Sequence, residues 1–135
     1  MDSELRGKLK QKGLKRLFNS FKYAWEGIVY ALKYEQNMLI HLLATVLVII
    51  LGLIVELSLV EWLFCLILIG LVIATELINS SLEAVVDLVS PDKNSLAKVA
   101  KDTASGAVLV LALTALIVGL IIFIPKIIIL IGGNI

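Results

Sequence analysis

The 135-residue sequence has few of the residues from which soluble catalytic sites are commonly built. Charged residues make up 17% of it, and it contains one histidine and one cysteine. The single cysteine, Cys65, excludes a disulfide within the chain, and no cluster of histidines and cysteines exists that could bind zinc. The nine glycines are scattered, so neither G-x-x-x-x-G-K-S/T nor G-x-G-x-x-G occurs. A P-loop or Rossmann-type nucleotide site is therefore excluded.

Hydrophobic residues, in contrast, make up 60% of the chain, far more than in a soluble globular domain. The pattern predicts one all-α integral membrane domain over residues 1–135, with membrane spans at about 38–55, 57–78 and 104–124. We expect Pro91 to stop the second helix, and Pro125 with Lys126 to end the third. His41 stands alone inside the first span, where a histidine is more often a helix-packing residue than a ligand.

The segment before the first span reads as an amphipathic helix over about residues 14–35. Its apolar residues recur at helical spacing, at Leu14, Leu17, Phe18, Phe21, Trp25, Ile28 and Leu32. Lysines and an arginine take the other side, which is typical of a helix that lies along a membrane surface. The alternative is a soluble helix that packs on a partner.

The distribution of basic residues predicts the orientation. Eight of the twelve Lys and Arg residues precede residue 37, and Lys93, Lys98 and Lys101 lie between the second and third spans. The connection Glu56–Glu61 between the first two spans contains none. By the positive-inside rule, the N-terminus and the connection Asp87–Asp102 are cytoplasmic.

One polar stripe interrupts the apolar pattern, and it falls on the helix of the second span. Glu76, Asn79, Glu83 and Asp87 lie within an arc of roughly 80° around a helix, and we call these four residues the acidic stripe. A span of ~20 residues must carry Glu76 to the edge of the hydrocarbon or inside it, where ionisable groups usually mark a functional site. The stripe could equally be a cation pathway or a proton relay, and Glu83 and Asp87 alone could be a solvated helix end.

Carboxylates, an amide and a lysine at one membrane face are suited to phosphate chemistry. Glu35, just before the first span, is expected at a depth similar to that of Glu83, and such oxygen ligands suit Mg²⁺ held together with nucleotide phosphates. Lys101 could meet phosphate oxygens, and Glu76 could accept the proton of an alcohol, oriented by Asn79. The residues alone leave two classes open: an ATP- and Mg²⁺-dependent lipid kinase, and a small cation or proton transport subunit.

Small residues on the second and third spans favour self-association through close helix packing. They are Gly70, Ala74, Ala100, Ala104, Ala107 and Ala112. Three spans offer little interior in which to cover the acidic stripe, so we expect a homo-oligomer.

These motifs resemble the prokaryotic diacylglycerol kinase family of small three-span lipid kinases. The resemblance is carried by E-L-I-N-S-S-L-E-A-V-V-D at residues 76–87, A-K-V-A-K-D at 97–102 and G-A-V-L from Gly106, and it extends from about Arg16 to about Ile124. The segment D-L-V-S-P at residues 87–91 resembles the Gram-positive branch, whose members act mainly as undecaprenol kinases. The resemblance implies a homotrimer in the bacterial plasma membrane with a shared cytoplasmic site, with ATP and a lipid alcohol as substrates and no nucleic-acid partner. Undecaprenol is the expected acceptor, and diacylglycerol is the alternative.

The resemblance also implies roles for individual residues. Glu76 would be the catalytic base, and Asn79 would support it. The nucleotide would be contacted by Arg16, Tyr23, Glu35, Glu83, Asp87, Lys101 and Asp102, and Glu35 and Glu83 would also bind Mg²⁺. The loop Asp92–Asn94 would reach the adenine, although it departs from the family's usual form, in which an aromatic residue often precedes histidine. Ser80 and Ser81 also stand where a Thr-Ala or Ser-Ala pair is commoner.

Overall fold

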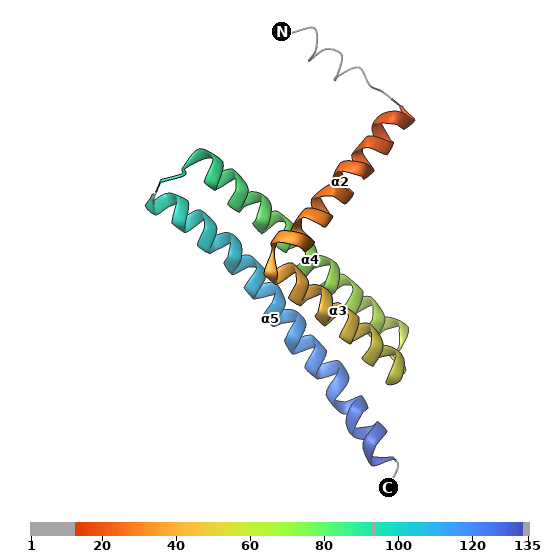
Figure 1. The fold of residues 1–135 in the computed structure, drawn as a ribbon. Helices are drawn as coiled ribbons and strands as arrows, with labels where there is room; N and C mark the ends of the chain where they lie inside the picture. The colour runs from red at the N-terminus through yellow and green to blue at the C-terminus, as the bar shows by residue number, and fades with distance from the viewer. Residues whose placement is uncertain (1–12, 93, 134–135) are drawn as a thin grey trace.

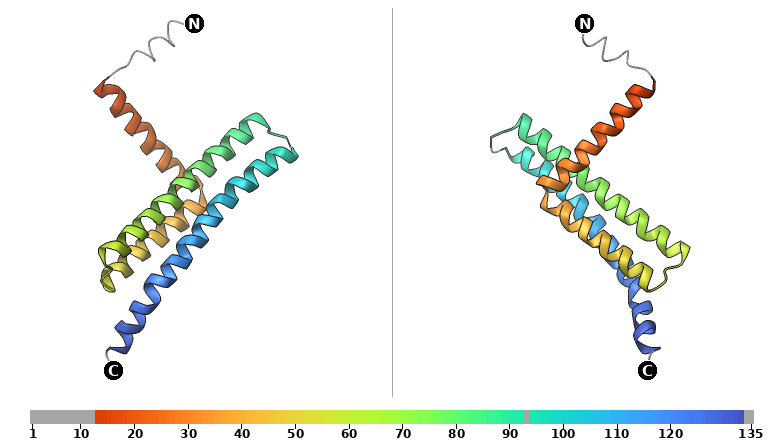
Figure 2. Two further views of the ribbon diagram at one scale, coloured as in Figure 1. Left: turned by 180° about the vertical axis from the view of Figure 1, so that it is seen from behind. Right: turned by 45° about the vertical axis from the view of Figure 1, so that its right-hand side comes forward.

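The structure is a computed structural model that describes residues 13–92 and 94–133, and in these residues the backbone forms four α-helices. They are α2 (Leu14–Tyr34), α3 (Gln36–Ile54), α4 (Leu59–Val89) and α5 (Ser95–Gly132) (Figure 1). Helices α3, α4 and α5 lie side by side and alternate in direction, while α2 projects away from them (Figures 1 and 2). Each of the three is long and apolar enough to cross a membrane, which confirms an all-α membrane protein. The basic segment before Gly13, and Lys93, lie outside the described residues.

A tight turn joins α3 to α4 and makes the two helices antiparallel. The backbone N–H of Leu57 donates to the carbonyl of Gly52 at 3.0 Å, and Glu56 adopts the left-handed conformation, with φ of 53°. Ser58 then caps α4: its hydroxyl accepts from the N–H of Glu61, and the Glu61 carboxylate accepts from the N–H of Ser58 at 2.7 Å. This capping box satisfies backbone groups that the first turn of a helix leaves unpaired.

The connection between α4 and α5 is shorter than the sequence predicted, because both helices extend into the segment Asp87–Asp102. Helix α4 continues to Val89, and α5 begins at Ser95. Pro91 stands just beyond the end of α4, as predicted. Asn94 caps α5, since its side-chain oxygen accepts from two backbone N–H groups of the first turn, the nearer at 2.8 Å.

The predicted helix end at Pro125 is wrong, because α5 continues through it to Gly132. Proline removes one backbone donor, so it disturbs a single bond to the preceding turn. Two neighbouring contacts keep the following residues in place. Lys126 forms an ion pair with Glu61 of α4 at 3.1 Å, and Ile127 packs against a cluster built on Leu57, Cys65 and Phe123.

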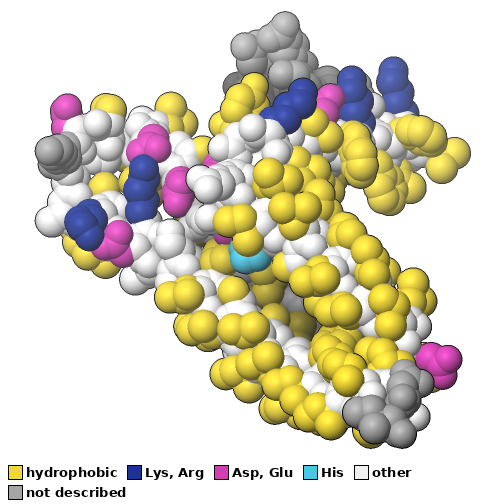
Figure 3. All heavy atoms as spheres, turned by 60° about the horizontal axis from the view of Figure 1, so that its bottom comes forward, with side chains coloured by type: hydrophobic (Ala, Val, Ile, Leu, Met, Phe, Trp, Pro, Cys, Tyr) yellow, Lys and Arg dark blue, Asp and Glu magenta, His cyan; other side chains and the backbone are white. Residues whose placement is uncertain are grey.

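The buried core of the chain is small for a protein of this size. In the described residues, the buried hydrophobic side chains are Ala31, Met38, Leu57, Cys65, Val72, Val108 and Phe123. Most large apolar side chains on all four helices are exposed instead, and they cover most of the face seen in Figure 3. Cys65 is buried, as expected for a small hydrophobic residue. An exterior of this kind requires lipid or other protein chains around it.

Candidate active site

Glu76 lies in the interior of the helical bundle. Its side chain is 1% exposed, the lowest value given for any charged residue in the described part of the chain. Its Oε2 atom is buried and has no hydrogen-bond partner among the described residues. A buried carboxylate oxygen without a partner is unfavourable for folding, so its persistence suggests a function.

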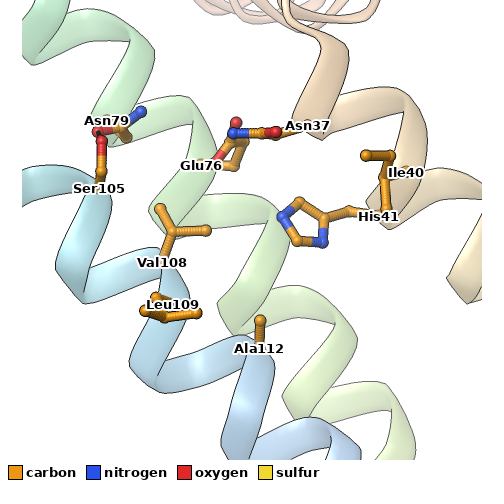
Figure 4. A pocket seen from close by; sticks show the side chains of 9 residues that line it. All are labelled: Asn37, Ile40, His41, Glu76, Asn79, Ser105, Val108, Leu109 and Ala112. Carbon is orange, nitrogen blue, oxygen red and sulfur yellow. Dashed lines mark hydrogen bonds between the residues drawn. The ribbon is translucent and has the colours of Figure 1, made fainter.

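A cavity of about 220 Å³ opens beside Glu76, and we call it the inner cavity. Its polar lining comes from three helices: Asn37 and His41 on α3, Glu76 and Asn79 on α4, and Ser105 on α5 (Figure 4). Its remaining wall is apolar and consists of Ile40, Val108, Leu109 and Ala112. The cavity therefore combines a buried carboxylate with an apolar surface at the depth of a membrane span.

Asn79, one turn along α4, is held by neighbours on both sides. Its side chain is 5% exposed, and its amide nitrogen donates to Oε1 of Glu83 at 3.1 Å. Its amide oxygen accepts from the hydroxyl of Ser105 on α5 at 3.4 Å. The predicted pair of Asn79 and Glu83 is thus directly connected, and Ser105 ties it to α5.

A second hollow, the outer cavity, lies where α4 and α5 approach their connecting loop. Its volume is about 530 Å³, within the usual range for small-molecule sites. Five charged side chains line it, and four of them form two ion pairs: Lys101 with Asp87 at 2.6 Å, and Lys98 with Asp102. The fifth is Asp92. The structure therefore brings three predicted nucleotide residues, Asp87, Lys101 and Asp102, to one surface.

Glu35 lies at the junction of α2 and α3, and its side chain is half-buried. Glu35 and Glu83 both lie close enough to Glu76 to interact with it electrostatically. In the described ranges, no group of three or more His, Cys, Asp or Glu side chains converges as a ready-made metal site. Mg²⁺ commonly takes only one or two carboxylates and obtains its other ligands from phosphates and water, so Glu35 and Glu83 fit it chemically.

Arg16 and Tyr23 are the predicted site residues that the single chain does not bring to the others. Both are exposed on α2. The N-terminal half of this helix points away from the loop between α4 and α5 in all three views (Figures 1 and 2). Their contact with a nucleotide stays a prediction.

Several polar residues of the two cavities were not predicted as site residues, and four of them bear on the chemistry: Asn37, His41, Lys98 and Ser105. Simple helical spacing could have indicated two of them. Lys98 and Ser105 lie four residues before Asp102 and four residues after Lys101, which places each on a face shared with a predicted residue. Asn37 and His41 are likewise four residues apart, but nothing in the sequence shows that they face Glu76.

The fold and the site together define a small membrane protein of three apolar helices with a buried carboxylate site and a charged hollow at one end. Comparison with known sequences identifies the class further. The sequence profile described as prokaryotic diacylglycerol kinase matches residues 22–123, most of the chain. The chain belongs to the prokaryotic diacylglycerol kinase family.

Individual relatives carry two different substrate names. The chain is 44% identical over 113 residues to an undecaprenol kinase of Bacillus subtilis, which covers 84% of this chain and 92% of that protein. It is 41% identical over 110 residues to a diacylglycerol kinase of Synechocystis, covering 81% of this chain and 63% of that protein. A diacylglycerol kinase of Pseudomonas aeruginosa is 35% identical over 108 residues, which is 80% of this chain and 87% of that protein.

Proposed function

We propose that the chain transfers the γ-phosphoryl group of ATP to the hydroxyl of a membrane lipid alcohol, with undecaprenol as the preferred acceptor. The observation that carries this proposal is the buried Glu76 carboxylate, whose unpartnered oxygen borders a cavity with an apolar wall. A lipid alcohol matches such a site, because its hydroxyl needs a polar partner at the depth of its own apolar chain.

Glu76 acts as the general base. As the alcohol oxygen attacks the γ-phosphorus, the hydroxyl proton passes to the Glu76 carboxylate. An oxygen–phosphorus bond forms, the bond between the γ-phosphorus and the bridging oxygen breaks, and ADP leaves. Asn79 keeps its place through Glu83 and Ser105, so the polar groups around the reacting oxygen are fixed before the substrate enters.

The phosphate chain lies between the outer cavity and Glu76. Asp87 is eleven residues from Glu76, about 16 Å along the helix axis. Lys101 neutralises phosphate charge from the outer cavity, and Asp102 borders the same surface. Glu35 and Glu83 would hold Mg²⁺ with the phosphates, where the ion offsets the charge that develops during transfer.

The working protein is a homotrimer in the bacterial plasma membrane. Open space surrounds Gly70 and Gly106 on the chain, and small residues favour close packing against a second helix. Helix α2 lies along the cytoplasmic membrane surface, with its exposed Leu17, Phe18 and Phe21 in the lipid. Residues such as Arg16 then border the nucleotide site.

The undecaprenol preference is supported by the 44% identity to the Bacillus subtilis enzyme. The apolar wall of the inner cavity, formed by Ile40, Val108, Leu109 and Ala112, suits the hydrocarbon chain of either alcohol and does not select between them. Diacylglycerol is the second candidate acceptor, because the Synechocystis and Pseudomonas relatives carry its name.

The test uses purified protein in detergent micelles with Mg²⁺, ATP labelled in its γ-phosphate, and undecaprenol. The expected result is label in undecaprenyl phosphate, lost when a chelator removes Mg²⁺. The alternative, a transport subunit, predicts no label in lipid and instead a cation or proton flux across liposomes that does not need ATP.

A further inference from the structure

Besides Glu76 and the hydrogen-bonded Asn79, the inner cavity has polar side chains on a further helix, α3. Asn37 and His41 lie one turn apart on the same face of α3, and both side chains point toward Glu76 across the cavity (Figure 4). In the space-filling view, His41, the chain's single histidine, lies in a hollow surrounded by hydrophobic side chains (Figure 3). A polar ring in such a place needs a reason beyond packing.

The polar groups of the cavity differ in what they already bind. Asn79 donates a hydrogen bond to Glu83 and accepts one from Ser105. Among the described residues, the His41 imidazole makes no hydrogen bond, although it interacts electrostatically with Glu76, whose Oε2 also lacks a partner. Two hydrogen-bonding groups are therefore available on opposite sides of the cavity.

The rest of the cavity indicates what kind of molecule can use these two groups. Its volume of about 220 Å³ corresponds to about seven water-sized groups at ~30 Å³ each. Ile40, Val108 and Leu109 form an apolar wall. The space accommodates one hydroxyl and the first few carbons of a lipid chain.

We propose that His41 is a positioning residue for the acceptor: its imidazole N–H donates a hydrogen bond to the lipid hydroxyl, whose own proton faces Glu76. This proposal rests on the kinase function proposed above. The imidazole neither gains nor loses a proton in the reaction. It fixes the acceptor oxygen so that a lone pair faces the γ-phosphorus, while the proton passes to Glu76 and ADP leaves.

The test compares two substitutions that separate hydrogen bonding from packing. His41→Leu fills the same space without a polar atom, and His41→Gln keeps a donor. With undecaprenol varied at saturating ATP, His41→Leu is expected to lower kcat/KM for the alcohol about tenfold, the value of one good hydrogen bond. His41→Gln is expected to stay within about threefold of the wild type, on the same hydrogen-bond scale. The KM for ATP should change in neither.

Thr45→Val is the matched control on the same helix. The Thr45 hydroxyl donates to the backbone carbonyl of His41 at 2.8 Å but does not line the cavity. Thr45→Val removes a hydroxyl one turn further along α3, away from the acceptor. The kcat/KM for undecaprenol and the KM for ATP should therefore stay at the wild-type values. Size-exclusion chromatography shows whether each variant keeps the assembly of the wild type. If His41→Leu loses that assembly, His41→Ala takes its place, with the same expected loss of kcat/KM.

Three results would overturn the role of His41. They are a wild-type kcat/KM for His41→Leu, a kcat/KM for His41→Gln as low as that of His41→Leu, and a KM for ATP that changes as much as the KM for the alcohol. The first two indicate packing, and the third indicates a general distortion of the site. Failure of the kinase function itself is distinguishable, because the wild-type protein would then phosphorylate no lipid alcohol at all.

Discussion

Replacing Glu76 with glutamine removes the proposed base and keeps nearly the same shape in the inner cavity. The side chain is 1% exposed and borders the inner cavity, where in the proposed complex the lipid hydroxyl lies beside it. The hydrogen bonds of Asn79 run to Glu83 and Ser105 and do not use Glu76, so the neighbouring network should survive. Loss of a general base lowers the rate by ~10²–10⁴-fold, or about 2.7–5.4 kcal/mol of transition-state stabilisation.

The assay is phosphoryl transfer from labelled ATP to undecaprenol by Glu76→Gln and wild-type protein in the same micelles. Glu56→Gln makes the same chemical change at an exposed turn at the other end of α3, and it should leave the rate unchanged. Size-exclusion chromatography should show the same assembly for all three proteins. If Glu76→Gln keeps more than about a tenth of the wild-type kcat, Glu76 is not the base, since base loss costs at least ~10²-fold.

Three further predictions concern the metal, the nucleotide and the packing. Glu35→Ala and Glu83→Ala should each require more Mg²⁺ for half-maximal rate, and an unchanged Mg²⁺ titration would remove that residue from the metal site. Lys101→Met should raise the KM for ATP about tenfold or more while the KM for the lipid stays constant, since it loses a charged phosphate contact; equal changes in both would contradict a phosphate role. Gly52→Ala should lower the stability in detergent by about 1–3 kcal/mol, because its Cβ would lie 2.7 Å from the ring of Trp62; a thermal unfolding midpoint at the wild-type value would show that the ring moves freely.

Much of the fold could be predicted because its signals are local. Long apolar stretches predict α3, α4 and α5, and Pro91 follows the end of α4 as expected. Length also predicted the membrane depth of Glu76, since a span that starts near Trp62 must include it. Its burial within a single chain was not predicted, because three spans were expected to cover the acidic stripe poorly. Pro125 was misleading, because contacts of Lys126 and Ile127 with other helices hold α5 together beyond it.

The candidate site was predictable only where several of its residues share one helix. The acidic stripe on α4 follows from spacing alone, and the structure adds the contact between Asn79 and Glu83. The sequence could not predict that His41 faces Glu76, because a nearly uniform apolar helix such as α3 has no periodicity that fixes its rotation about its axis. Arg16 and Tyr23 could not be placed from one chain, since α2 has few partners within it.

The most direct test of the account is kcat/KM for undecaprenol and for diacylglycerol, measured with purified wild-type protein, saturating ATP and Mg²⁺ in matched micelles. The account predicts phosphorylation of both alcohols, with the higher efficiency on undecaprenol. Equal or higher efficiency on diacylglycerol would contradict the preferred acceptor, and no phosphorylated lipid from either alcohol would contradict the kinase function itself.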